Sequence, residues 1–161
     1  MRRKILIADD HSIVSKGLEQ IIHSEWPDAR IYMVENASQL IEKALERSWD
    51  LIITDISMPG VSGIAALQEL KQKASKIPIL VMSMFSAEEY ASAAFQYGAS
   101  GYIEKTTIHT SLIDAIKTIL SGSVFILPEQ AHFLQKPSGK KKLLHEILSQ
   151  REFYVMKELA K

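Results

Sequence analysis

The sequence predicts an α/β domain in which a doubly wound sheet of five parallel strands carries helices on both faces. Three observations predict it. Short apolar runs alternate five times with segments whose apolar residues recur at helical spacing. The runs are apolar throughout, as strands buried on both faces of a parallel sheet are. The chain has 161 residues, enough for one such domain and an extension.

The predicted strands are rich in β-branched and aliphatic residues, the composition that fits a pleated, buried surface. They cover residues 4–8, 30–34, 51–54, 77–82 and 101–103. Helical segments lie between them, around residues 13–22, 37–48, 64–70, 90–95 and 112–120. We expect Ser12 to be the N-cap of the first helix, and Gly98 and Gly122 to close the last two. Right-handed crossovers should join the strands.

After Gly122 the pattern changes, which predicts three parts in the chain. Residues 1–122 form the α/β domain, and residues 123–147 form a linker with a short helix near 129–135. Residues 148–161 begin a further helix, since Ser149 and Glu152 have the spacing of a capping box. The predicted architecture is thus the sheet domain with a C-terminal helical linker extension.

The zero net charge is a cancellation between two regions. Residues 1–135 hold 12 basic and 16 acidic side chains, and residues 136–161 hold 7 and 3. The basic tail points to an acidic partner. The absence of cysteine excludes disulfides, thiolate catalysis and cysteine-bound zinc. Neither a run of about 20 apolar residues nor a signal peptide is present, so we expect a cytoplasmic protein without membrane association.

Polar residues at the strand ends predict the functional site. In a doubly wound sheet, ligands bind beyond the carboxyl ends of the strands. Asp9 and Asp10 follow the first strand, Asp55 the third, Ser83 the fourth and Lys105 the fifth. Clustered carboxylates suit Mg²⁺, and a lysine can pair with a phosphoryl oxygen. Aspartate can also attack phosphorus and form an aspartyl phosphate.

Each of these residues is common at such a position when taken alone. Aspartate at a strand end is frequent in turns and caps, and a lysine is usually solvated. Because one complementary set occupies four of five strand ends, we favour a functional cluster. The five histidines lack metal-ligand spacing, and His11 is expected only to influence the acidic pair beside it.

The motifs at these strand ends resemble those of the receiver domain of two-component response regulators. They are residues 7–11 (Ile-Ala-Asp-Asp-His), residues 54–60 (Thr-Asp-Ile-Ser-Met-Pro-Gly), Ser83, and residues 101–105 (Gly-Tyr-Ile-Glu-Lys). The resemblance covers residues 4–121 and implies the flavodoxin-like receiver fold. It also implies that a sensor histidine kinase phosphorylates Asp55.

The resemblance further implies a role for each site residue. Asp10 and Asp55 would bind Mg²⁺ with their side chains, Ser57 with its backbone carbonyl, and Asp9 through water. Ser83 and Lys105 would hold the phosphoryl group. Tyr102 would be an aromatic switch that moves inward with Ser83, and Pro59 and Gly60 would shape the loop after Asp55.

Tyr102 and Ser83 could equally have purely structural roles. Tyr102 would then be a half-buried strand aromatic, and Ser83 a cap for the helix that begins near Glu88. The bulky Met84 and Phe85 follow Ser83, where many receivers carry smaller or polar residues. They can alter how water reaches the phosphate.

Residues 148–160 resemble the first helix of the helix-turn-helix domain of LuxR-type regulators, so the whole resembles the NarL/FixJ class. The sequence stops at Lys161, before the recognition helix that reads DNA. We therefore expect a C-terminally truncated transcription regulator. It would contact DNA only through the missing helices, with no DNA-binding residue in this chain, and could form a homodimer on phosphorylation.

Three other protein classes fit the sequence less well. A phosphohydrolase with an aspartyl phosphate would carry a second aspartate two residues after the nucleophile, where Ser57 stands. A receiver-like interaction module that is never phosphorylated does not need the complete acidic set and Lys105. A flavin-binding protein would have a phosphate loop in place of residues 9–11. We therefore expect no enzyme activity beyond Mg²⁺-dependent self-phosphorylation and dephosphorylation.

Overall fold

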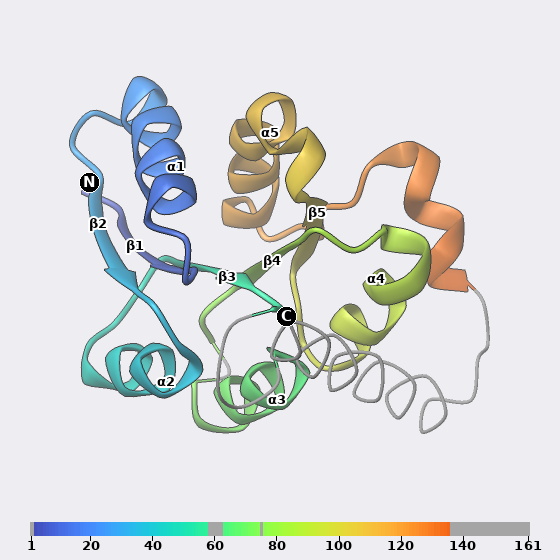
Figure 1. Ribbon diagram of the computed structural model, residues 1–161, viewed down its shortest axis with the longest axis horizontal. Coiled ribbons are helices and arrows are strands. Elements are labelled where there is room, and N and C mark those ends of the chain that lie inside the picture. Colours follow the sequence, from blue (N-terminus) through green and yellow to red (C-terminus); the bar gives the residue numbers. More distant parts are fainter. Residues whose placement is uncertain (1, 58–62, 75, 136–161) are drawn as a thin grey trace, which may run out of the picture.

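A five-stranded parallel sheet lies between two layers of helices in the computed structural model, which describes residues 2–57, 63–74 and 76–135 (Figure 1). The strand order is β2-β1-β3-β4-β5. All five predicted strands are confirmed, with small shifts at their ends. They are β1 (Lys4–Ala8), β2 (Arg30–Val34), β3 (Leu51–Asp55), β4 (Ile79–Ser83) and β5 (Gly101–Glu104).

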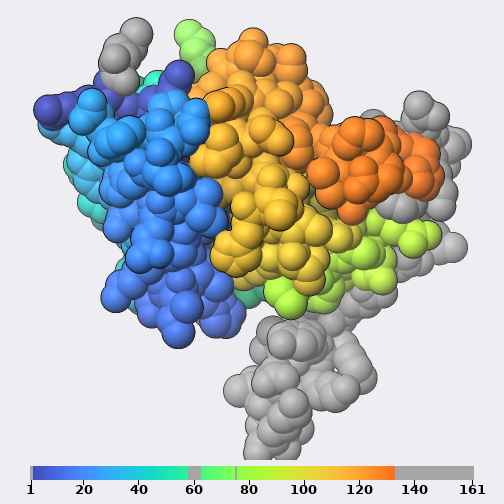
Figure 2. All heavy atoms as spheres, turned by 90° about the horizontal axis from the view of Figure 1, so that it is seen from above, coloured from blue at the N-terminus to red at the C-terminus, as the bar shows by residue number. Residues whose placement is uncertain are grey.

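The helices cover both faces of the sheet. Helices α1 and α5 lie on one face, where Figure 2 shows them side by side, and α2, α3 and α4 lie on the other (Figure 1). Their bounds are α1 (Ser12–Glu25), α2 (Ala37–Glu46), α3 (Gly63–Lys73), α4 (Ala87–Gln96) and α5 (Ile108–Leu120). Two 3₁₀ helices, η1 (Lys105–Thr107) and η2 (Pro128–Gln135), complete the described chain. No helix among these described residues has the length and apolar composition needed to cross a membrane.

Two hydrophobic cores, one on each face, explain why the central strands are largely apolar, whereas the edge strand β2 carries the exposed Arg30 and Met33. Ile5 and Ile7 of β1 pack with the residues of α1 and α5, while Leu6 and Ala8 pack with α2, α3 and α4. All four side chains are fully buried. Alternate residues of a strand point to opposite faces, so both positions must be apolar when both faces are covered.

The helix ends confirm two of the expected signals and correct a third. Gly98 (φ +106°) and Gly122 (φ +95°) follow α4 and α5 in the left-handed region, which only glycine enters freely. The expectation that Ser12 caps α1 is wrong. Ser12 is the first helical residue, and His11 is the N-cap, with no hydrogen bond from its side chain to the helix.

Residues 123–135, which we name the C-terminal extension, continue along the edge of β5. The Phe125 amide donates to the Ser100 carbonyl (2.9 Å), and the Tyr102 amide donates to the Phe125 carbonyl (3.2 Å). Helix η2 then packs on α4, beside it in Figure 1. The short helix expected near 129–135 is thus present, as a 3₁₀ helix. The rest of the predicted linker and the helix of residues 148–161 lie outside the described residues.

Candidate functional site

The strand-end residues singled out in the sequence meet at the carboxyl edge of the sheet. Asp9 directly follows β1, and Asp55 ends β3, the neighbouring strand. Ser83 ends β4, and Lys105 begins η1 immediately after β5. Because β1 and β3 are adjacent central strands, their terminal carboxylates are held side by side, and the lysine reaches them from the edge strand.

Lys105 connects the two buried aspartates. Its Nζ lies 2.8 Å from Oδ2 of Asp55 and 2.9 Å from Oδ2 of Asp9. The side chain of Lys105 is only 9% exposed. It is therefore a buried cation between two carboxylates, and the idea that Lys105 is an ordinary solvated lysine is wrong.

Burial and ion pairing change the pKa values of Asp55 and Lys105. Desolvation raises the pKa of Asp55, and the hydrogen bond and charge of Lys105 offset this only in part. Desolvation also lowers the pKa of Lys105, but the attraction of Asp55 and Asp9 outweighs it and leaves the pKa above its usual value. Lys105 therefore stays charged, while the ionised form of Asp55 needs a neighbouring positive charge to stabilise it.

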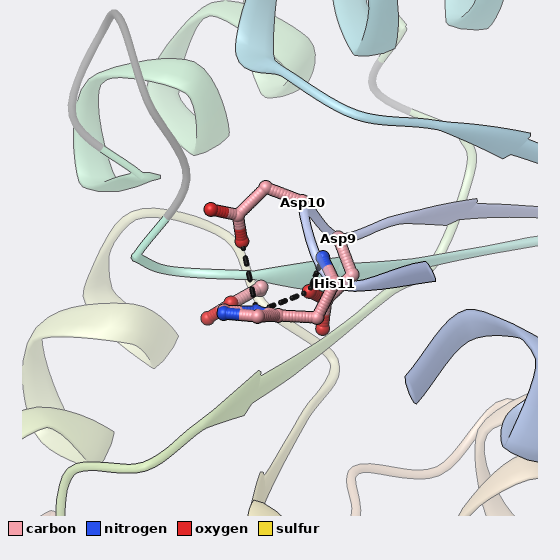
Figure 3. A group of neighbouring side chains, drawn as sticks. Asp9, Asp10 and His11 are labelled. Atoms are coloured by element: carbon pink, nitrogen blue, oxygen red, sulfur yellow. Dashed lines mark hydrogen bonds and ion pairs between the residues drawn. The ribbon is translucent and has the colours of Figure 1, made fainter. Parts of the chain in front are cut away.

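Asp9, Asp10 and His11 form a compact group after β1 (Figure 3). The His11 amide donates to Oδ1 of Asp9 (2.8 Å). Nδ1 of His11 lies 3.1 Å from Oδ1 of Asp9 and 3.0 Å from Oδ1 of Asp10. The sequence predicts only that His11 influences the acidic pair. The structure adds that the His11 ring contacts both carboxylates directly. The position of His11 next to Asp10 in the sequence is the signal that could have indicated this contact.

The group fits a hard divalent cation. One ligand atom each from Asp9, Asp10, His11 and Asp55 lies within 4.8 Å of the others. Oδ2 of Asp9 is buried, and its partner within the described part of the chain is Lys105, at ion-pair distance. Asp10 is partly exposed, with 29% of its side chain open to solvent. Two buried carboxylates, of Asp9 and Asp55, beside the accessible carboxylate of Asp10 are the kind of oxygen donor set that Mg²⁺ uses with its waters.

Ser57 lies beside Asp55, in the loop after β3. Its amide donates to Oδ1 of Asp55 (2.9 Å), so both oxygens of this carboxylate have a hydrogen-bond donor. The Ser57 hydroxyl is buried and has no hydrogen-bond partner among the residues that the structure describes. Pro59 and Gly60, expected to shape the same loop, lie outside the described residues.

Ser83 and Tyr102 are both fully buried, on the neighbouring strands β4 and β5. Oγ of Ser83 accepts a hydrogen bond from the Phe85 amide (2.9 Å), and the Tyr102 hydroxyl donates to the Phe85 carbonyl (2.8 Å). Burial raises the pKa of Tyr102 well above its usual value, against a smaller opposing effect of the Ser83 hydroxyl. Tyr102 is therefore a neutral donor.

Two details of the structural roles suggested for Ser83 and Tyr102 are wrong. Ser83 does not cap α4, because Ser86 occupies the N-cap position of that helix. Tyr102 is completely rather than half buried, with 0% of the residue exposed.

An apolar hollow that the sequence did not reveal adjoins Lys105. Its volume is about 370 Å³, and its walls come from α1, the start of α5 and Met84. Ile13 of α1 and Met84 are 85% and 66% exposed, which is high for large apolar residues. The site therefore has an apolar rim next to its charged centre.

The comparisons with known proteins agree with this fold. The family model of the response regulator receiver domain matches residues 5–117. The transcriptional regulatory protein DegU of Brevibacillus brevis is 34% identical over 137 residues, which are 83% of this chain and 56% of DegU. The chain spans between 56% and 62% of the length of the first curated relatives it matches.

Solved structures match as well. A LuxR-family two-component response regulator from Aurantimonas sp. SI85-9A1 superposes with a TM-score of 0.76 at 29% identity, covering 84% of this chain and 96% of that one. The isolated receiver domain of RcsB from Salmonella enterica serovar Typhimurium, in the presence of the phosphomimetic BeF₃⁻, gives 0.73 at 26% identity. That match covers 83% of this chain and 99% of the RcsB domain.

Proposed function

The chain belongs to the response regulator receiver domain family, and we propose that Asp55 accepts a phosphoryl group from a sensor histidine kinase. The observation that carries this proposal is the buried Asp55 carboxylate held 2.8 Å from Lys105 at the carboxyl edge of the sheet. The domain boundaries follow the same proposal: a receiver over residues 1–122, a linker over 123–147, and the start of a helix-turn-helix domain over 148–161.

Each side chain has one part in the reaction. An Asp55 oxygen forms the new bond to phosphorus while the bond to the leaving group of the donor breaks. Lys105 neutralises charge on the phosphoryl oxygens, and the Ser83 hydroxyl donates to one of them. The burial that raises the pKa of Asp55 also keeps water from the carboxylate. Tyr102 acts with Ser83 as the switch, through their common contact with Phe85.

Mg²⁺ is the cofactor that this donor set suits. Asp10 and Asp55 would bind it with their carboxylates, Ser57 with its backbone carbonyl, and Asp9 through water. Bound there, the cation would balance the negative charge that gathers during phosphoryl transfer. The close grouping of the Asp9, Asp10 and Asp55 carboxylates supports a cation at this point.

The proposed output is regulation of transcription. DegU is a transcriptional regulatory protein, and the Aurantimonas relative is of the LuxR family. We propose a cytoplasmic regulator of this class, in which phosphorylation of the receiver favours a homodimer and a helix-turn-helix domain binds DNA. Its chemistry is limited to Mg²⁺-dependent transfer to and loss from Asp55, without turnover of a separate substrate. The apolar hollow beside Lys105 offers the kinase a contact surface next to the reacting carboxylate.

A small phosphodonor tests the phosphoacceptor directly. With Mg²⁺ and acetyl phosphate, we expect intact-mass spectrometry to show one added phosphoryl group on the protein. The Asp55→Asn variant should show none. Asp114→Asn, which removes an exposed carboxylate from α5, should label like the original protein.

Undiminished labelling of Asp55→Asn would rule out Asp55 as the acceptor. A complete lack of labelling in the original protein, with kinase as with acetyl phosphate, would favour the alternative of an interaction module that is never phosphorylated.

A further inference from the structure

Glu104 caps α4 from the end of β5. Ser86 occupies the N-cap position of α4, but its side chain makes no capping hydrogen bond. The first amide of the helix, that of Ala87, donates instead to Oε1 of Glu104 at 2.8 Å, across 17 residues of sequence. Free amides at a helix start need an acceptor, and here a neighbouring strand supplies it.

The same strand holds the loop that precedes α4. We name residues 84–86 the β4–α4 loop. Tyr102 donates to the Phe85 carbonyl in this loop, and Glu104 accepts from the first amide after it. Tyr102 and Glu104 are two residues apart on β5, so their side chains leave the strand on the same face. Two side chains on the same face of β5 therefore hold the loop at its middle and at its C-terminal end.

Glu104 and the β4–α4 loop both connect to the proposed phosphoryl site. Glu104 is paired in register with Ser83, the proposed phosphoryl ligand, and is followed by Lys105. Oγ of Ser83 in turn accepts the Phe85 amide, so the position of the loop sets the orientation of this hydroxyl. A displacement of α4 would move Phe85 and, through its amide, the Ser83 hydroxyl.

We propose that Glu104 is a positioning residue of the phosphoryl site, which holds the β4–α4 loop so that Ser83 is oriented for the phosphoryl group. The inference rests on the proposed function, since it assigns Ser83 to that group. A carboxylate at a helix start also interacts favourably with the helix dipole, which adds to the hydrogen bond. Glu104 thus links the reacting centre to α4, on which η2 of the C-terminal extension packs.

Three variants separate the possible roles of Glu104. Glu104→Ala removes the acceptor. Glu104→Gln keeps an acceptor oxygen and removes only the charge. Glu88→Ala is the matched control, because Glu88 lies exposed in the first turn of the same helix.

Amide exchange followed by NMR measures the contact without any phosphoryl ligand. Since loss of a helix cap weakens the helix start, we expect Glu104→Ala to speed exchange at Ala87 and Phe85 about fivefold. Glu104→Gln should restore most of the protection, and Glu88→Ala, which removes a first-turn charge but no hydrogen bond to either amide, should change the exchange rates much less than Glu104→Ala does. Equal exchange in Glu104→Ala and the original protein would overturn the inference.

Titration with BeF₃⁻ and Mg²⁺, followed by the Ser83 and Lys105 amide signals, measures the consequence for the site. Glu104→Ala should bind the analogue about fivefold more weakly, by the same loss of a cap, and Glu104→Gln within about twofold of the original. Unchanged affinity in Glu104→Ala would overturn the positioning role. If the original protein does not bind BeF₃⁻, the phosphoacceptor proposal fails, and the exchange rates alone decide whether Glu104 holds the loop.

Discussion

The buried environment of Asp55 disfavours the ionised form of its carboxyl group. The residue is 1% exposed, and desolvation raises the pKa of its carboxyl group. Lys105 offsets part of this cost, but Asp9 competes for the same ammonium group. If Asp55 is the phosphoacceptor as proposed, its burial exchanges stability for function, a common relation in proteins.

Asp55→Asn should therefore stabilise the fold at neutral pH. Lys105 keeps Asp9 as its partner in this variant, and we expect the free energy of unfolding to rise by about 1 kcal/mol. Urea denaturation at pH 7 measures it.

The pH dependence of the folding stability follows from the raised pKa of Asp55. A raised folded-state pKa means that protonated Asp55 stabilises the fold below its ordinary pKa near 4, and that this contribution is lost as pH rises through the folded-state value. The difference between Asp55→Asn and the original protein should thus shrink towards pH 4. A variant that is less stable at pH 7 would show that the Lys105 pair outweighs the cost of burial.

At the scale of elements, Gly63 fixes the distance between α3 and the end of β3. A Cβ at Gly63 would overlap backbone atoms of Ile56, the residue after Asp55. A side chain here would force α3 away from the site or displace the Asp55 loop.

Gly63→Ala should lower the free energy of unfolding by about 2 kcal/mol, as overpacking does. Gly17→Ala is the matched control in the interior of α1. No atom of the described residues lies within 4 Å of a Cβ at Gly17, so alanine should stabilise α1 by about 0.5–1 kcal/mol. Thermal or urea denaturation of the two variants measures both effects, and a stable Gly63→Ala variant would contradict the close approach.

The elements show what sequence patterns can and cannot predict. Strands and glycine stops were predicted because apolar runs and left-handed glycines are local signals. The predicted N-cap of α1 was wrong, because Ser12 has a suitable side chain but lies one residue inside the helix. The cap of α4 by Glu104 could not be predicted, because strand pairing alone brings these distant residues together.

At the scale of the whole molecule, the sequence predicted the charged centre of the site but not its apolar rim. Asp9, Asp55 and Lys105 follow strand ends, and the order of a doubly wound sheet brings such ends together. The hollow beside Ile13 and Met84 depends on how α1 packs beside α5, which no motif encodes.

The acidic centre also predicts how the whole fold responds to Mg²⁺. Binding to the folded state alone adds about 2.7 kcal/mol when Mg²⁺ is roughly 100 times its Kd, so Tm should rise by several degrees. Asp10→Asn removes a proposed ligand and should lose most of this rise in differential scanning calorimetry. An equal rise in Asp10→Asn, or with NaCl of matched ionic strength, would argue against a specific site.

The bridge between Phe125 and Gly101 has a consequence for solubility. A sheet edge with open amides and carbonyls can recruit strands from other molecules, which leads to aggregation. Phe125 occupies that edge at β5, and at the opposite edge β2 carries the exposed, charged Arg30. A shortened protein ending at Gly122 would keep every proposed site residue. It would nevertheless present β5 to its neighbours, so a useful fragment for expression has to extend past Phe125.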